Sequence, residues 1–164
     1  MTIPFTRAVR RVALALPLLW TALAVAPANA QSLQDQIVGT WTLSSVYDQH
    51  EDGSRTNPWG DGVEGQLTYT ANGRFSLMII SANRPPSNGP PPTPIGPALG
   101  YFGTYTVDRG AVVHLPERST FPNWQGHDRP LMTTVSGDQM AQTAPAIGPP
   151  GQSYVPHLNW TRSR

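Results

Sequence analysis

The sequence predicts an all-β fold, a single antiparallel up-and-down barrel of about eight short strands. After residue 31 no segment keeps the apolar period of a helix, apart from a short turn at Leu33–Ile37. Runs typical of strands recur instead, and turn residues join several of them into hairpins. Closing the sheet into a barrel removes the unpaired edges that a meander of hairpins would expose, and a β-sandwich is the main alternative.

Composition limits the chemistry available to the chain. Its 164 residues allow one ordinary domain, and 18 Pro with 15 Gly make about a fifth of them, below the roughly 25–30% typical of low-complexity chains. The sequence contains no Cys and no Lys, which excludes disulfides, thiolate metal sites, cysteine nucleophiles and Schiff-base chemistry. The formal charge of +1 gives no reason to expect nucleic-acid binding.

Residues 1–30 have the order of a secretory signal peptide. A segment with three Arg and no acidic residue precedes an apolar run from Val12 to about Ala26, and Ala28-Asn29-Ala30 supplies the small residues of a cleavage site. The apolar run is shorter than the roughly 20 residues of a transmembrane helix, and Pro17 interrupts it, so we expect no stable membrane insertion after cleavage. Cleavage near Ala30 would leave a domain over residues 31–164, periplasmic or secreted; a retained membrane anchor is the alternative.

The first strands of this domain include the clearest hairpin in the sequence. Gly39–Tyr47, rich in Thr, Val and aromatic residues, is the first predicted strand. Apolar and polar residues alternate along Val63–Thr70. Ala71-Asn72-Gly73 then supplies a turn, because Asn and Gly tolerate positive φ, and Arg74–Ile80 returns as the partner strand.

Two further hairpins and a closing strand complete the predicted barrel. Their turns are an Asp-Arg-Gly and a Ser-Gly-Asp tripeptide. The predicted strands are Tyr101–Val107 with Ala111–Leu115, Leu131–Val135 with Gln139–Thr143, and finally Tyr154–Arg162.

A proline-rich loop at residues 84–99 interrupts the series of strands. Seven of the 13 residues from Pro85 to Pro97 are Pro, and Pro cannot donate to a β ladder. We expect an exposed loop with polyproline II character. It is interpreted as a flap beside the barrel mouth, with a docking strip for a partner as the alternative.

Several segments resemble a known family. Gly39-Thr40-Trp41 at the start of the first strand is similar to the G-x-W signature of lipocalins and their relatives. In that superfamily the Trp closes one end of the barrel and an Arg near the chain end packs across it, which implies these structural roles for Trp41 and Arg162. Further matches, in family order, are Asp52–Arg55, Gly65–Thr70, Asn72–Ser76, Gly100–Asp108, Phe121–Gly126 and Leu158–Arg162.

Together these segments resemble the bacterial lipocalin-like domain family over nearly all of residues 37–162. The resemblance implies a calycin-type β-barrel that can hold a cavity, and it implies no particular reaction. The sequence departs from the family at Arg84–Leu99, where prolines replace a short helical segment that relatives usually carry.

The interior of an eight-stranded barrel is just wide enough to be filled by side chains or to hold one small ligand. The leading interpretation is non-enzymatic binding of a small, mostly apolar molecule, without a cofactor. The alternation along the strands predicts that seven side chains point into the barrel: Leu67, Tyr69, Phe75, Leu77, Ile79, Tyr105 and Val107. The residues predicted to bind the ligand are Tyr69, Phe75, Leu77, Tyr105, His114, Asn123 and Trp124.

Two other functions remain open at this point. A filled barrel would act as a protein-interaction module, and a cyclase- or isomerase-like enzyme would act on a hydrophobic small molecule. The oligomeric state is not predictable from the sequence.

The densest polar cluster extends from His114 through the loop predicted after it, as far as Arg129. A catalytic interpretation makes His114 a general base, Glu117 its orienting partner and Arg118 an anion clamp. We favour the alternative, that these residues form hydrogen-bonded loop architecture or contacts that orient a ligand. No metal site is predicted, because the four His form no short ligand motif and there is no Cys.

Overall fold

The structure, a computed structural model, describes residues 31–85 and 96–164. The predicted signal peptide and the central part of the proline-rich loop lie outside the described residues. Leu33–Ile37 forms the short helix α1, in which the Ser32 side chain accepts a hydrogen bond from the backbone N–H of Asp35. The strands are β1 (Gly39–His50), β2 (Arg55–Thr56), β3 (Glu64–Tyr69), β4 (Arg74–Ile80), β5 (Ala98–Asp108), β6 (Ala111–Ser119), β7 (Arg129–Ser136), β8 (Gln139–Thr143) and β9 (Tyr154–Arg162), with a 3-10 turn η1 (Pro122–Trp124) between β6 and β7.

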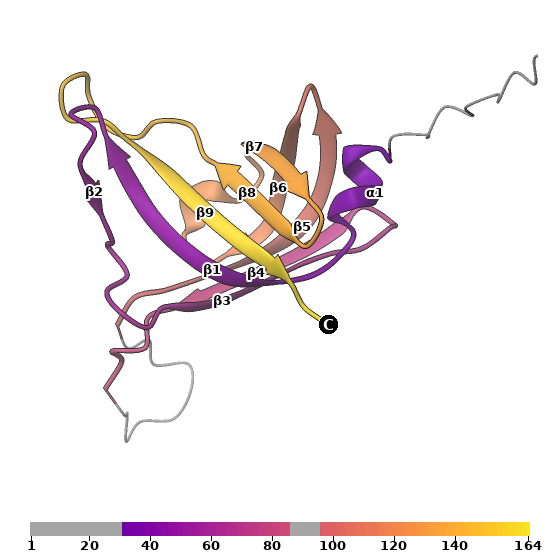
Figure 1. Cartoon of the computed structure of the whole chain (residues 1–164), viewed down its shortest axis with the longest axis horizontal. Coiled ribbons are helices and arrows are strands. Elements are labelled where there is room, and N and C mark those ends of the chain that lie inside the picture. The colour runs from indigo at the N-terminus through magenta and orange to yellow at the C-terminus, as the bar shows by residue number, and fades with distance from the viewer. Residues whose placement is uncertain (1–30, 86–95) are drawn as a thin grey trace, which may run out of the picture. The chain divides into compact units, whose positions relative to one another are not determined.

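Eight of these strands close into an antiparallel up-and-down barrel, which confirms the predicted fold class (Figure 1). Each strand from β3 to β8 pairs with the next one along the chain, β1 pairs with β3, and pairing of β1 with β9 closes the ring. The short β2 pairs only with the end of β1, outside the ring. The sandwich alternative is therefore excluded.

The end of β6 differs from the prediction. Glu117 and Arg118 lie in this strand, and the loop predicted there begins only after Ser119. The predicted strand ended before Pro116, because Pro is rare within a β ladder. The structure accommodates it with a β-bulge, since the register between β5 and β6 shifts between Phe102 and Gly103. β5 likewise begins at Ala98, inside the range given to the proline-rich loop.

Gly103 lets β5 pass close to this bulge. A Cβ atom on Gly103 would lie 2.1 Å from the carbonyl oxygen of Leu115 and 2.9 Å from the backbone nitrogen of Glu117. Both are backbone atoms of a paired strand, so they cannot move aside as a flexible side chain would. We expect Gly103→Ala to lower the free energy of unfolding by about 3 kcal/mol, the upper part of the range for overpacking. Urea denaturation measures this change.

Gly100→Ala in the same strand is the matched control. A Cβ at this position would meet the far end of the flexible Met78 side chain, 3.2 Å away, and the Thr120 methyl group at 3.8 Å, which is an ordinary van der Waals distance. The loss of stability should therefore be much smaller than for Gly103→Ala. Equal losses in the two variants would contradict the role of the bulge.

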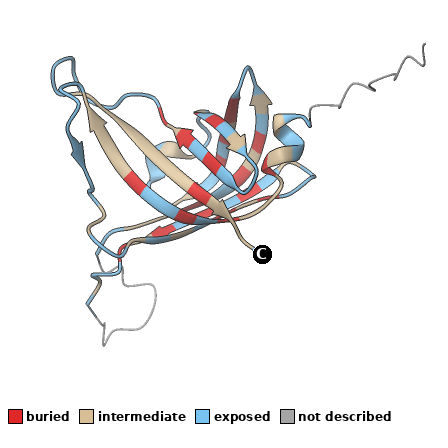
Figure 2. Cartoon of the chain, in the orientation of Figure 1, coloured by how far each residue is buried: buried red, intermediate tan, exposed pale blue. Residues whose placement is uncertain are grey.

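Buried and exposed residues alternate along the strands, so that one face of the sheet lines the interior (Figure 2). Six of the seven residues predicted to point inward are buried, and the seventh, Val107, packs partly buried against the core. The largest fully buried side chains include Trp41, Trp160, Tyr69 and Met140. They occupy the half of the barrel next to α1.

Trp41 and Arg162 form a layered contact at this end. The Trp41 indole is fully buried and its Nε1 donates to the carbonyl oxygen of Ile37 at 2.7 Å. The guanidinium of Arg162 lies 4.2 Å above the indole ring and donates to the carbonyl oxygens of Gln36 and Val38 at 2.6 and 2.8 Å. These contacts hold α1 and the start of β1 against the end of β9.

Two features of the structure explain why the residue two positions before Trp41 is glycine. Gly39 has a φ of +131°, a conformation that L side chains rarely adopt. A Cβ there would also lie 2.9 Å from Nη1 of Arg162. The spacing of Gly39 and Trp41 thus leaves room for the arginine that covers the indole.

Candidate functional site

A cavity of about 340 Å³ opens at the end of the barrel opposite α1. This volume lies within the roughly 300–1,000 Å³ typical of small-molecule sites. The walls come from the second halves of β1 and β4, the first halves of β5 and β9, the start of β7, and the connections around them. The lining is mostly apolar: Val46, Pro58, Trp59, Leu77, Ile79, Pro97, Leu99, Trp124, Leu131, Ala144, Ile147, Pro156 and Leu158, with Asp48, Tyr101, Arg129 and Tyr154 as its polar members. The barrel is thus packed in one half and hollow in the other.

Arg129 brings a positive charge into this lining. Its guanidinium carbon lies 3.3 Å from the centre of the Trp124 ring, and its Nε is buried without a hydrogen-bond partner. Burial lowers the pKa of Arg129, but arginine remains protonated in proteins. Among the residues that the structure describes, no carboxylate lies within ion-pair distance of it.

Tyr101 lies beside Arg129 in the same lining. Burial raises the pKa of Tyr101 to about 12, partly offset by the nearby charge of Arg129. The phenol is therefore neutral at physiological pH and keeps its proton. The Tyr101 ring also contacts Trp124 edge to face, with the ring centres 5.4 Å apart.

Asp48 is the acidic group of the cavity. Burial raises its pKa, and the charges of His50 and His157 lower it. His157 stacks on Tyr47 with the ring centres 4.8 Å apart, and His50 packs against Tyr154. The carboxylate thus belongs to the wall that β1 and β9 form, next to the imidazoles of His50 and His157.

A buried polar network lies beneath the cavity, in the packed half. The His114 ring is fully buried between Tyr69, whose Oη lies 2.6 Å from Nε2, and Tyr101, whose Oη lies 3.3 Å from Nδ1. Gln142 donates from Nε2 to Tyr69 Oη and to Thr133 Oγ1. Burial, aided by the charge of Arg129, lowers the pKa of His114 to about 3, so the imidazole is neutral at physiological pH.

The residues predicted to bind a ligand lie at three heights in the barrel. Leu77 and Trp124 line the cavity. Asn123 is exposed in η1. The other four are buried in the packed half below: Tyr69, Phe75, Tyr105 and His114. That these seven residues contact a ligand stays a prediction.

Sequence reasoning missed several residues of the cavity. Tyr101 shares the strand alternation of Tyr105, which was the signal that it points inward. Arg129 belonged to the polar cluster, but it was interpreted there as part of a loop, whereas it is the first residue of β7. Asp48 lies in the part of β1 that the predicted strand left out.

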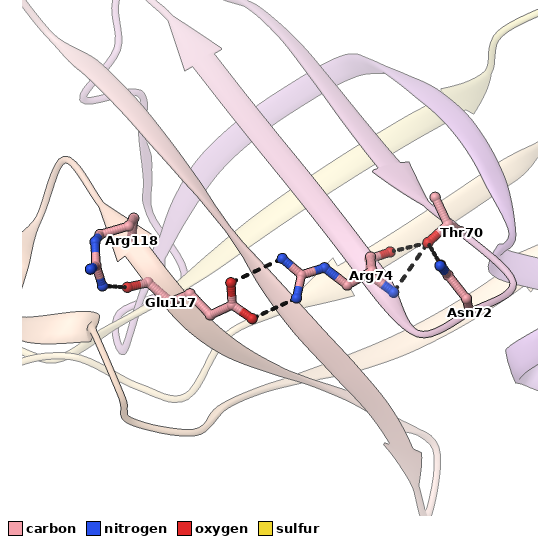
Figure 3. A network of polar contacts seen from close by, with 5 residues as sticks. All are labelled: Thr70, Asn72, Arg74, Glu117 and Arg118. Atoms are coloured by element: carbon pink, nitrogen blue, oxygen red, sulfur yellow. Dashed lines mark hydrogen bonds and ion pairs between the residues drawn. The ribbon is translucent and has the colours of Figure 1, made fainter.

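The three catalytic candidates do not come together. His114 is fully buried, whereas Glu117 and Arg118 are exposed. Glu117 instead forms a bidentate ion pair with Arg74, at 2.6 and 2.9 Å, and Arg118 donates to the carbonyl oxygen of Glu117 at 2.7 Å (Figure 3). The hydrogen bonds from Arg74 lower the pKa of Glu117. This exposed network connects the β3–β4 hairpin with β6 on the outside of the barrel.

The described residues contain neither a cluster of metal ligands nor a membrane-spanning helix. No three His, Asp or Glu side chains come together in a way that could hold a metal ion in residues 31–85 and 96–164. Within the same ranges, no helix has the length and apolar character needed to span a membrane.

Comparisons with known proteins complete the description. A family model described as a lipocalin-like domain matches residues 38–163. The comparisons with curated proteins and with solved structures returned no match. The family match covers all eight strands of the closed barrel, and it fits the resemblance read from the sequence. The chain therefore belongs to the lipocalin-like domain family.

Proposed function

We propose that the chain is exported and binds a small, mostly apolar molecule non-covalently in the barrel cavity. The observation that carries the proposal is the cavity of about 340 Å³, walled mainly by apolar side chains above a packed floor. Membership of the lipocalin-like family supports small-molecule binding in general. The driving force is removal of apolar ligand surface from water, and burial of about 200 Å² contributes roughly 5 kcal/mol before the costs of association.

Titration with a neutral apolar fluorophore, N-phenyl-1-naphthylamine, tests the cavity directly. We expect saturable binding and energy transfer from Trp59 and Trp124, which line the cavity. Ala144→Phe places a ring in the cavity and should weaken binding at least about tenfold, because the side chain occupies the ligand volume. The fluorescence change measures both effects.

Ala141→Phe is the matched control, since Ala141 is exposed in the neighbouring strand β8. It introduces the same side chain outside the cavity and should leave the affinity unchanged. Equal weakening by both variants, or no saturable binding to the wild type, would contradict binding in the cavity.

The order of residues 1–30 supports the export part of the proposal. Intact-mass measurement of the protein recovered from the expressing cells and from their extracellular or periplasmic fraction tests it. We expect the exported form to lack residues 1–30. A double variant, Ala28→Arg with Ala30→Arg, removes the small residues of the cleavage site and should retain the full mass. A full-length wild-type protein confined to the cell interior would contradict export.

A further inference from the structure

We propose that the cavity binds amphipathic carboxylates, with the acid group held by Arg129 and Tyr101 and the apolar tail along the remaining walls. This inference rests on the proposed function, because it names the ligand class of the same site. Three observations carry it: an unpaired buried donor, a second donor whose proton is directed by the network beneath it, and an apolar lining around both.

The first donor is Arg129. Its contact with Trp124 uses the flat face of the guanidinium, and this leaves the N–H groups at the edge available for hydrogen bonds in the ring plane. Nε at this edge is buried and has no partner. A buried N–H without an acceptor is costly, and Arg129 lines the cavity, so a ligand that brings acceptors to this guanidinium is favoured. A carboxylate matches both the charge and the planar geometry of an arginine.

The second donor follows from the hydrogen-bond directions in the network below. Thr133 has a single hydroxyl proton, which it donates to the carbonyl oxygen of Leu131 at 2.8 Å, so its oxygen accepts from Gln142. The amide nitrogen of Gln142 therefore faces Thr133, and the same nitrogen donates to Tyr69. Because Tyr69 accepts this bond, its own proton goes to Nε2 of His114 at 2.6 Å.

The neutral His114 then carries its proton on Nδ1. This nitrogen faces Tyr101, so the Tyr101 oxygen accepts from His114. Arg129 lies beside this oxygen in the cavity lining, and since its side chain has only donors it cannot take the Tyr101 proton. The hydroxyl proton of Tyr101 is thus left for an acceptor in the cavity. Arg129 and Tyr101 are both donors there, which selects an anionic oxygen group and disfavours ammonium groups.

The other charged member of the lining does not oppose this assignment. Asp48 lies on β1, whereas Arg129 is the first residue of β7, and β8 and β9 separate these two strands in the sheet. The two charges therefore lie on different walls. The lining between them is apolar, with Leu77, Ile79 and Leu131 among its residues, and it suits a hydrocarbon tail.

Three ligands that share one tail test the inference: decanoate, decanol and decylamine, measured by displacement of N-phenyl-1-naphthylamine at pH 7.5. For the wild type we expect decanoate to bind about 10- to 100-fold more tightly than decanol, as for a hydrogen bond to a charged group, and decylamine to bind more weakly than decanol. Arg129→Gln should reduce decanoate binding to the level of decanol and leave decanol binding unchanged. Tyr101→Phe should weaken decanoate binding about 2- to 10-fold.

The control and the outcomes separate the two proposals. Arg118→Gln removes an exposed charge outside the barrel and should change none of the affinities. Unchanged decanol binding by Arg129→Gln shows that this variant is folded and its cavity intact. Equal affinities of the wild type for decanoate and decanol, or a preference that survives Arg129→Gln, would overturn the carboxylate assignment alone. Failure of all three ligands to displace a bound probe would also overturn the carboxylate assignment. Failure of the probe itself to bind would overturn the proposed function.

The tautomer of His114 provides a test without any ligand. Nitrogen-15 NMR of the imidazole distinguishes protonation at Nδ1 from protonation at Nε2. We expect the Nδ1–H form, and an Nε2–H form would overturn the donor direction assigned to Tyr101.

Discussion

Acidification is expected to lower the free energy of unfolding by about 5 kcal/mol through His114 alone, as an order of magnitude. Burial lowers the pKa of this imidazole from 6.5 to about 3 in the folded protein. Each unit of difference corresponds to about 1.4 kcal/mol. Below pH 6.5 the unfolded chain binds a proton that the folded protein does not, so the contribution is fully present above pH 6.5 and is lost as the pH falls toward 3. Urea denaturation at intervals between pH 7 and pH 3 measures the loss.

His114→Gln isolates this contribution from other titrating groups. The variant has no imidazole at this position, so its stability should fall less steeply below pH 6.5, by up to about 1.4 kcal/mol per pH unit relative to the wild type. Asp48 acts in the opposite direction, because its pKa is raised in the folded state, but it acts equally in both proteins. His127→Gln, in an exposed loop, is the matched control and should follow the wild type. Parallel pH profiles for the wild type and His114→Gln would contradict the assignment.

Trp41→Ala is expected to lower the free energy of unfolding by about 4 kcal/mol, within the roughly 3–5 kcal/mol found for removal of a buried tryptophan. The indole is fully buried, donates a hydrogen bond to Ile37 and lies under the guanidinium of Arg162. The substitution leaves a cavity in the packed half and removes the surface on which the arginine lies. Chemical denaturation followed by circular dichroism measures the change.

Two variants bracket this effect. Trp41→Phe keeps an aromatic ring but loses the hydrogen bond to Ile37, and it should give an intermediate loss. Phe102→Ala removes an aromatic ring that is 46% exposed on the outside of the barrel, and it should cost less than about 1 kcal/mol. A loss for Trp41→Ala no greater than for Phe102→Ala would show that the indole does not stabilise the closed end.

The fold was largely predictable because its hairpins are local. The turn at Ala71-Asn72-Gly73 and the strands around it depend on neighbouring residues, and β4 was predicted with its observed bounds. The end of β6 was not, because Pro116 is a strand breaker unless a bulge forms, and the bulge requires Gly103 on the partner strand. That requirement joins residues from two different strands and cannot be seen in either segment alone.

The candidate site was less predictable for a geometric reason. Alternation along a strand tells whether a side chain points inward, and it was right for Tyr69, Phe75 and Tyr105. It does not tell the height of that side chain along the barrel axis, which decides between the packed half and the cavity. The height follows from the register of all eight strands and from the position of α1. Arg129 was interpreted as part of a loop for a different reason: the predicted strand began at Leu131, whereas β7 begins at Arg129, whose charge lies against Trp124 in the cavity wall.

Closure of the ring by β1 and β9 has a consequence for the order of folding. Trp41 pairs with Arg162, so the contact that completes the barrel joins segments separated by most of the domain. The loop-closure entropy of such a contact is lost before the contact can stabilise the fold, which makes this step slow. A chain emerging from the ribosome cannot complete the barrel until β9 has left the exit tunnel. Until then the edges of β1 and β8 remain unpaired, and this incomplete sheet is the species most exposed to aggregation.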